Sequence, residues 1–339
     1  MAILPKSAVE TLFDLIDQTT TLIEQNLETT YLDALTESIA NIADGGRVKV
    51  EDNLPDAQTV AQLETIYATV KLNQFDAETI RQALQLATLK GLRQVKVEPN
   101  KQMTPDAIGY LVAYLAEVFG GADQIKTVLD PVIGTGNLLA TVMNHIQNLT
   151  GNKLQGFGVD NDDSLLELAG ISSELQGLDT TLFHQDAIEP LMVNPVDIAV
   201  ADLPIGFYPI DERAADFETH AASGHSYAHH LLIEQTMHYV KDGGFGFFLV
   251  PNVILETDDA KQLVKWITKH VYLQGLLSLP VNLFKTKEGQ KAILVLQKQG
   301  AGAQQAKQIL LGEFPNSNDQ KAFAAYLQQI RTWHKENIN

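Results

Sequence analysis

The sequence contains no cysteine among its 339 residues. This absence excludes disulfide bonds, metal sites built on thiolates and every reaction that needs a cysteine nucleophile. Hydrophobic residues make up 45% of the chain and charged residues 19%, which is typical of globular domains with a sizeable core. A chain of this length forms one large domain or two of ordinary size.

Basic residues are scarce relative to acidic ones. Lys and Arg total 24 while Asp and Glu total 42, so the formal net charge is −18 with neutral histidines. A net field of this sign repels polyanions unless basic residues gather locally. The charge balance therefore argues against tight, non-specific binding of nucleic acid.

Long apolar runs are also missing. No segment approaches the roughly 20 consecutive apolar residues that a membrane-spanning helix needs. The N-terminal segment MAILPKSAVETLFDL lacks a basic stretch followed by a long apolar one. We therefore expect no secretory signal, and a cytoplasmic protein.

Two hydrophobic patterns divide the chain. Up to about residue 98, apolar residues recur at spacings of three and four, which predicts a helical N-terminal domain over 1–98. From about residue 124, short apolar runs alternate with helical patterns. We predict strands over 126–130, 154–160, 181–186, 197–203, 244–251, 273–280 and 291–298. We predict helices over 137–149, 162–176, 226–241 and 258–270.

Strands that alternate with helices favour a parallel sheet covered on both faces. The last two predicted strands leave no room for a crossover helix, so we expect them to form an antiparallel hairpin. The prediction is an α/β fold with a seven-stranded, mostly parallel sheet whose last strand is antiparallel. We assign this sheet to a domain over 99–300, followed by a short C-terminal tail over 301–339 with a helix over 319–335.

The strongest local signal follows the first predicted strand. The strand ends in Asp130-Pro131, and the loop Gly134-Thr135-Gly136 precedes a helix. Glycines let the backbone approach a ligand, and the helix start offers free N–H groups. Asn137 follows Gly136 where a P-loop needs Lys, which excludes that motif. Asp130 would repel a pyrophosphate, whereas it suits a cationic ligand.

Acidic residues follow three later strands. Asp160 ends the second predicted strand, Asp186 the third, and Asp202 closes the fourth. Ligands of open parallel sheets bind outside the carboxyl ends of the strands, and an acid on the second strand can accept hydrogen bonds from ribose hydroxyls. These acids are therefore expected to lie in one site.

Between Gln102 and Lys298, the order of these segments resembles S-adenosylmethionine-dependent methyltransferases that act on amino groups. The likeness is to adenine-specific DNA methyltransferases related to the modification subunits of type I restriction systems, and to their stand-alone relatives in Gram-positive bacteria. A helical N-terminal region also suits that group. The resemblance implies the class I, Rossmann-like methyltransferase fold and S-adenosylmethionine as the cofactor.

The resemblance also implies roles for individual residues. The glycine loop and the strand-end acids match the family's cofactor site, and Met103-Thr104-Pro105 matches the segment that helps to hold the methionine part. The implied cofactor-binding residues are Thr104, Asp130, Pro131, Gly134, Thr135, Gly136, Asn137, Leu138, Asp160, Asn161, Asp186 and Ala187.

Asp202-Leu203-Pro204-Ile205 falls where the family carries Asn or Asp, two prolines and an aromatic residue. An exocyclic amine is a poor nucleophile because its lone pair is delocalised into the ring. The Asp202 carboxylate and the Leu203 carbonyl can accept its two protons as hydrogen bonds and favour the attacking form. Ile205 cannot stack on the target ring as the family aromatic does. Phe207, or Tyr208 as a substrate contact, is expected to reach in instead. The expected catalytic residues are Asp202, Leu203, Pro204 and Phe207.

Two further groups of residues need an interpretation. Lys285, Lys287 and Lys291 lie in the connection of the final hairpin, on the expected site side, and either contact phosphates or form a solvated basic loop. His220, His225, His229 and His230 cluster in sequence, but no further ligand set accompanies them. We therefore assign them loop and helix roles and expect no metal.

The sequence leaves the methyl acceptor open. The resemblance makes adenine in DNA the first candidate, and the absence of cysteine excludes methylation at carbon five of cytosine or uracil, which needs a cysteine nucleophile. A glutamine side chain of a protein or a base in RNA fits the same amine chemistry. A silent cofactor-binding interaction module is a further alternative, motivated by Ile205. The tail is short, so we expect a target-recognition domain to be either missing or supplied by a protein partner.

Overall fold

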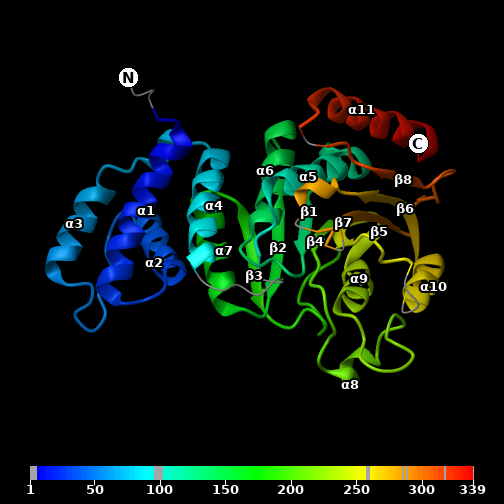
Figure 1. Cartoon of the computed structure of the whole chain (residues 1–339), viewed down its shortest axis with the longest axis horizontal. Helices are drawn as coiled ribbons and strands as arrows, with labels where there is room; N and C mark the ends of the chain where they lie inside the picture. The colour runs from blue at the N-terminus through cyan, green and yellow to red at the C-terminus, as the bar shows by residue number, and fades with distance from the viewer. Residues whose placement is uncertain are drawn as a thin grey trace.

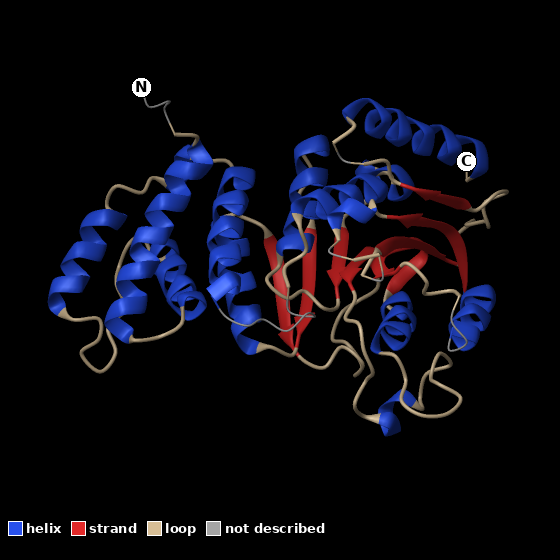
Figure 2. Ribbon diagram, in the orientation of Figure 1, coloured by secondary structure: helices blue, strands red, loops and turns tan. Residues whose placement is uncertain are grey.

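The computed structural model describes residues 6–94, 102–256, 260–284, 286–287, 289–316 and 318–338. Its N-terminal part is helical, as Figures 1 and 2 show. The elements are α1 (Ala8–Leu27), α2 (Tyr31–Ala43), α3 (Ala57–Tyr67), the short 3-10 helix η1 (Leu72–Gln74) and α4 (Ala77–Gln94). The predicted helical N-terminal region is confirmed. Its boundary at residue 98 stays a prediction, because residues 95–101 lie outside the described residues.

The strands form one sheet. Its members are β1 (Thr127–Asp130), β2 (Gln155–Asp160), β3 (Asp179–His184), β4 (Val196–Asp202), β5 (Val240–Pro251), β6 (Val271–Ser278), β7 (Lys291–Lys298) and β8 (Leu310–Glu313). The spatial order is β3-β2-β1-β4-β5-β7-β6-β8. Strand β7 is antiparallel to both β5 and β6, while the other neighbours pair in parallel. The mostly parallel sheet and the antiparallel hairpin are confirmed.

The sheet has eight strands where seven were expected. The additional strand, β8, lies in the segment expected to be only a tail, and it pairs in parallel with β6. Its four residues are too few for a visible alternation, which is why the sequence pattern did not reveal it. The expected C-terminal helix is present as α11 (Gln320–Asn337).

Helices cover the sheet on both faces, as Figure 2 shows. The covering helices include α5 (Asp106–Gly120), α6 (Asn137–Thr150), α7 (Asp163–Leu175), α9 (Ala228–His238) and α10 (Ala260–His270). The short helix α8 (Asp211–Ala214) lies in the loop between β4 and α9, and the short turns η3 (Ala122–Gln124) and η4 (Val281–Leu283) lie in other connections. The four helices predicted between the strands correspond to α6, α7, α9 and α10. Each is confirmed, with ends that differ by a few residues.

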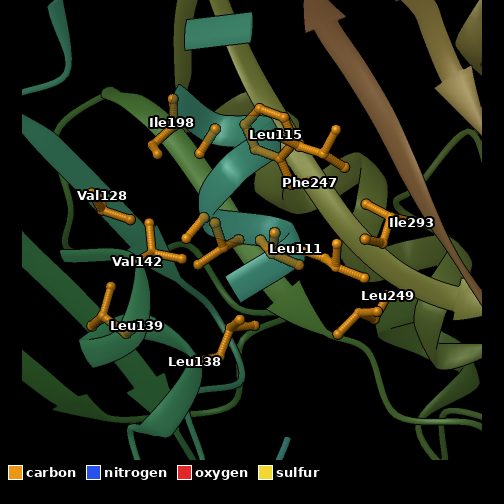
Figure 3. Close-up of a cluster of buried hydrophobic side chains, with 14 of the residues drawn as sticks. Leu111, Leu115, Val128, Leu138, Leu139, Val142, Ile198, Phe247, Leu249 and Ile293 are labelled. Atoms are coloured by element: carbon orange, nitrogen blue, oxygen red, sulfur yellow. The ribbon is translucent and has the colours of Figure 1, made fainter. Parts of the chain in front are cut away.

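Alternation along the central strands explains the two hydrophobic cores. Successive side chains of a strand point to opposite faces. Val128, Ile198 and Phe247 pack with α5 and α6, as Figure 3 shows with Leu111 and Leu115. Their strand neighbours, such as Leu129 and Phe248, belong to the core on the opposite face. The central strands are therefore buried on both sides, as expected for a covered parallel sheet.

The N-terminal helices pack onto the sheet-containing part of the chain. Their core is formed by α1 to α4 and includes Leu168 of α7. Helix α2 contacts α7, and α4 contacts both α6 and α7. Helix α6 begins directly after the glycine loop. The helical region therefore touches the elements that position that loop.

The parallel order brings the ends of β1, β2 and β4 to one edge of the sheet. Asp130, Asp160 and Asp202 are the last residues of these strands. Strand β3 ends at His184, so the strand predicted over 181–186 is shifted and Asp186 lies in the following loop. Within the described ranges, no helix is long and apolar enough to cross a membrane.

Candidate active site

A cavity of about 430 Å³ lies at this edge of the sheet. Most of the residues expected at the site line it. They are Thr104, Pro131, Gly134, Thr135, Asn137, Leu138, Asp160, Asn161, Asp186, Ala187, Asp202, Pro204 and Tyr208. Of the other expected residues, Asp130, Gly136, Leu203, Phe207, Lys287 and Lys291 do not line the cavity, and Lys285 lies outside the described residues.

The glycine loop forms one wall of the cavity. Gly134 and Gly136 have φ angles of 53° and 80°, in the left-handed region that favours glycine. A Cβ atom on Gly134 would meet open space, whereas one on Gly136 would lie 3.1 Å from the Cβ atom of Ala169. Gly134 therefore leaves room on the cavity side, while Gly136 allows α6 to approach α7.

Asp160 is held in place by the backbone. Its Oδ2 atom accepts a hydrogen bond of 2.7 Å from the Gly134 amide, and its Oδ1 atom accepts one of 2.9 Å from the Asp162 amide. Each carboxylate oxygen has two acceptor positions. The fixed carboxylate can therefore also accept hydrogen bonds from two hydroxyl groups of a ligand.

Asp130 lies behind the cavity wall. It is 1% exposed, and its Oδ1 atom accepts a hydrogen bond of 3.1 Å from the Val132 amide. Burial raises the pKa of Asp130 well above its usual range, and the charges of Asp160 and Asp202 add to this rise. The geometry therefore gives Asp130 a role in shaping the loop, whereas the sequence predicted contact with the cofactor.

Asp186 is part of a polar cluster that sequence analysis missed. Its Oδ2 atom accepts hydrogen bonds of 2.6 Å from the Tyr208 hydroxyl and 2.9 Å from Arg213. Arg213 also pairs with Glu189 at 2.6 Å. Burial and then the Asp186 carboxylate raise the pKa of Tyr208. Tyr208 is thus a cavity wall residue that holds Asp186, and its ring is not free to turn towards a substrate without breaking this bond.

Asp202 stands at the end of β4 with both oxygens engaged. The Thr104 hydroxyl donates a hydrogen bond of 3.0 Å to Oδ2, and the Lys291 ammonium pairs with Oδ1. Lys291 is the first residue of β7 and reaches Asp202 past β5. Lys291 was expected to face a phosphate or solvent. In the structure it contacts the carboxylate of Asp202, the expected catalytic residue.

Phe207 lies beside the cavity and is 57% exposed. Its ring stacks on Tyr227 with a centroid distance of 4.6 Å and an interplanar angle of 25°. Gly206 precedes it with a φ of 136°. Ile205, at the family's aromatic position, is also exposed. The loop that follows Asp202 thus carries an exposed aromatic ring that is stacked on Tyr227.

The histidines lie in separate surroundings. His225 pairs with Asp211 at 3.0 Å on the surface, whereas His229 and His230 are buried in α9. Burial, and then the neighbouring His230, lower the pKa of His229 to about 3. Burial lowers the pKa of His230 to about 4. Among the described residues, no group of three or more acidic or histidine side chains is arranged to hold a metal ion.

The residues of the cavity fit the cofactor that the family resemblance implies. Four lining residues are acids, namely Asp160, Asp162, Asp186 and Asp202, and no lysine or arginine is among the described lining residues. Such a cavity repels phosphates and favours a cation. Ile133, Leu138, Leu165 and Ile188 add apolar surface. A ligand with a sulfonium charge, a ribose and an apolar ring face meets complementary groups here.

Comparisons with known proteins lead to the same family as the resemblance in sequence. Residues 10–92 match the family model of the YtxK N-terminal helical domain, and residues 94–338 match that of N-6 DNA methylase. The uncharacterized protein YtxK of Bacillus subtilis is 38% identical over 335 residues, which cover 98% of this chain and 99% of that protein.

Solved structures share the fold. The crystal structure of a candidate class I S-adenosylmethionine-dependent methyltransferase from Listeria monocytogenes has a TM-score of 0.88 at 38% identity, covering 96% of this chain and 98% of that one. The methyltransferase subunit of a type I restriction-modification system from Streptococcus thermophilus has a TM-score of 0.65 at 15% identity, covering 94% and 74%. The chain belongs to the N-6 DNA methylase family and is an N-methyltransferase that uses S-adenosylmethionine.

Proposed function

We propose that this enzyme transfers a methyl group to the exocyclic amino group of adenine in DNA. The observation that carries the proposal is the position of Asp202. Its carboxylate lines the cofactor cavity at the end of β4 and is held by Thr104 and Lys291, and the loop that follows it carries the exposed ring of Phe207. A hydrogen-bond acceptor followed by a loop with an exposed aromatic ring suits an amine on a flat ring.

Three parts of the cavity would hold the cofactor. Asp160 would accept hydrogen bonds from the ribose hydroxyls. The loop that contains Asp186 and Ala187 would border the adenine ring, and Thr104 and Asn137 would border the methionine part. When bound, S-adenosylmethionine supplies a methyl group that its sulfonium charge makes electrophilic.

Asp202 and the Leu203 carbonyl would orient the acceptor. Two hydrogen bonds from the amine to these oxygens would favour a pyramidal nitrogen, whose lone pair is no longer delocalised into the ring and points towards the methyl group. A carboxylate oxygen can accept two hydrogen bonds, so Oδ1 can serve the amine while it remains paired with Lys291. The amine would gain the methyl group as the bond between that group and sulfur breaks, and Asp202 would then take the proton that the amine loses and pass it to water.

A base in a duplex must leave the stack before it can reach Asp202. Phe207 supports such a step, because its solvated ring can stack on an extruded base where Ile205 cannot. Lys285 and Lys287 would contact the phosphates beside the extruded base. The net charge of −18 makes binding through these few lysines weak, so we propose that a protein partner adds the contacts that select the target. Chromosomal DNA as the substrate implies a cytoplasmic location.

One observation favours a second candidate function. Oδ1 of Asp202 is already bonded to the Lys291 ammonium, at the atom where the acceptor amine would bind. If the Lys291 ammonium also blocks the second acceptor position of Oδ1, the chain binds its cofactor and transfers nothing, as an interaction module would. Protein glutamine and RNA bases remain alternative acceptors, since Asp202 would orient their amines in the same way.

The test uses S-adenosylmethionine with a labelled methyl group, incubated with the purified protein and extract from cells that lack the gene. Label in DNA that disappears with Asp202→Ala supports the proposal. Label in RNA or protein would overturn the substrate and keep the mechanism. No label in any fraction, with cofactor binding intact, would favour the interaction module. Asp160→Ala is the parallel control, because it should weaken cofactor binding and lower transfer together.

A further inference from the structure

A buried arginine of the N-terminal helical region reaches the cofactor cavity. Arg81 lies on α4 and is 2% exposed. Its guanidinium forms two parallel hydrogen bonds with Asp106, of 2.7 and 2.8 Å, and two with Glu78, of 2.9 and 2.7 Å. A buried charge is stable only when it is paired and hydrogen-bonded in this way. These two acids already compensate the positive charge of Arg81.

Arg81 makes two further hydrogen bonds that its charge balance does not require, one of 3.3 Å to the Tyr110 hydroxyl and one to Asn137. Its Nη1 atom donates a hydrogen bond of 2.8 Å to Oδ1 of Asn137. Asn137 is the first residue of α6, directly after the glycine loop, and it lines the cavity. The contact therefore joins the N-terminal helices to the residue on which the cofactor loop ends.

This contact decides which way the Asn137 amide points. Since Arg81 can only donate, Oδ1 of Asn137 must face it and Nδ2 must face the other way. Nδ2 donates a hydrogen bond of 2.8 Å to the Thr104 carbonyl and one of 3.2 Å to Asp106. The Thr104 hydroxyl in turn donates 3.0 Å to Oδ2 of Asp202. A continuous series of polar contacts thus runs from Arg81 to the proposed catalytic carboxylate.

A second feature places α4 behind the same wall. A void of about 20 Å³, the size of one water molecule, is lined by Arg81, Leu84 and Gln85 of α4. Met103, Thr135 and Asn137 line both this void and the large cavity. Helix α4 therefore packs behind the wall of the cofactor cavity. We expect a change in the length of the Arg81 side chain to shift the residues that line both spaces.

We propose that Arg81 is a positioning residue for the cofactor site. It fixes the amide of Asn137 and, through Thr104, the carboxylate of Asp202, so the N-terminal helical region is a working part of the methyltransferase site. The inference rests on the proposed assignment of the cavity to S-adenosylmethionine. It does not depend on the methyl acceptor.

The test is calorimetric titration of the full-length protein with S-adenosylmethionine. Arg81→Lys keeps the positive charge between Glu78 and Asp106, but the compact ammonium lacks the planar fork that also reaches Asn137. We expect its dissociation constant to rise about tenfold, as for loss of a hydrogen bond made by a charged group. Arg331→Lys is the matched control, because Arg331 pairs with Glu117 on α5 at a distance from the cavity.

A double-mutant cycle separates positioning from simple stabilisation. If Arg81 acts through Asn137, Arg81→Lys should weaken binding by less than about twofold in an Asn137→Ala background. A merely structural arginine would lower the melting temperature of Arg81→Lys and leave the dissociation constant unchanged, which would overturn the inference. Equal effects of Arg81→Lys in both backgrounds would also overturn it.

Asp160→Ala distinguishes the two ways in which the proposal can fail. Normal cofactor binding by Asp160→Ala would show that the cavity assignment itself is wrong. Weak binding by Asp160→Ala together with normal binding by Arg81→Lys would leave the cavity assignment in place and reject only the role of Arg81.

Discussion

The ammonium group of Lys291 forms an ion pair with Oδ1 of Asp202, although 89 positions separate the two residues. The pair exists because β7 lies beside β5, which lies beside β4, and because Lys291 opens β7 at the edge where Asp202 closes β4. Both side chains are about one fifth exposed. The proposed amine acceptor is therefore held by a cation before any substrate arrives.

Lys291→Met should lower the rate of methyl transfer about 10–100-fold. This is the loss expected when a catalytic group, here the Asp202 carboxylate, is displaced by up to about 1 Å. Without the ammonium, Asp202 keeps only the Thr104 hydroxyl to hold its orientation. The measurement is the initial rate of label incorporation at saturating cofactor. Lys298→Met, at the other end of β7, is the control and should keep the normal rate. A faster rate for Lys291→Met would instead identify Lys291 as a brake on the enzyme.

Asp160→Ala should weaken S-adenosylmethionine binding by about 1.5–3 kcal/mol, the usual worth of hydrogen bonds to a charged group. The substitution removes the proposed ribose acceptor, and it also removes the partner of the Gly134 amide. Asp160→Asn retains one acceptor oxygen and should bind with intermediate affinity. Calorimetry measures both variants, and unchanged affinity in Asp160→Ala would remove this residue from the site.

Phe207→Ala should weaken capture of the acceptor base by about 1–3 kcal/mol, the typical contribution of stacking on an aromatic side chain. Phe207 does not line the cofactor cavity, so cofactor affinity should not change. The measurement is binding of a single-stranded oligonucleotide that contains adenine, in the presence of cofactor. Leu149→Ala removes another exposed apolar side chain, at the far end of α6, and serves as the control. Equal oligonucleotide binding by Phe207→Ala would exclude the stacking role.

The strand-end acids of the site could be predicted from the sequence. Short apolar runs that end in Asp130, Asp160 and Asp202 define parallel strands, and parallel strands place their last residues at one edge. The pairing of Lys291 with Asp202 could not be predicted in this way. It depends on β7 being inserted between β5 and β6, and hydrophobic periodicity carries no information about the order of strands in a sheet.

Side-chain directions within loops were equally hidden from the sequence. The position of Tyr208 after the catalytic motif predicted contact with substrate, whereas in the structure its hydroxyl donates to Asp186, which also accepts a hydrogen bond from Arg213. Arg81 lies 56 positions from Asn137, on a helix that the pattern assigned to a separate domain. Such contacts follow from tertiary packing, so only the structure identifies them.

The buried histidines of α9 should make the fold sensitive to mild acid. Their pKa values, about 3 for His229 and about 4 for His230, lie below the unfolded value near 6.5. The unfolded chain therefore binds protons first as pH falls. The contribution of these two histidines to the free energy of unfolding is fully present above about pH 6.5. It is lost as the pH falls from there towards the folded pKa values.

At pH 5 the free energy of unfolding should be lower by about 2 kcal/mol for each of these histidines. His230→Gln should therefore lose less stability than the unsubstituted protein when pH is lowered from 7 to 5. The measurement is urea denaturation of both proteins at the two pH values. Their difference at pH 7 reports only the packing cost of the substitution, which serves as the internal control. Equal losses on acidification would show that His230 does not control acid sensitivity.

The connection between β6 and β7 should determine the salt dependence of DNA binding. Lys287 is exposed there, and Lys285 lies two positions earlier in the sequence. Each lysine that neutralises a phosphate contributes about one unit to the slope of log K against log salt concentration. Lys287→Ala should therefore reduce the slope by about one unit and weaken binding to all duplex sequences alike.

Lys153→Ala, just before β2 at the opposite edge of the sheet, should leave the slope unchanged. If both Lys287→Ala and the double variant with Lys285→Ala keep the slope of the unsubstituted protein, the DNA lies elsewhere on the surface. With a net charge of −18, that outcome would favour a protein acceptor.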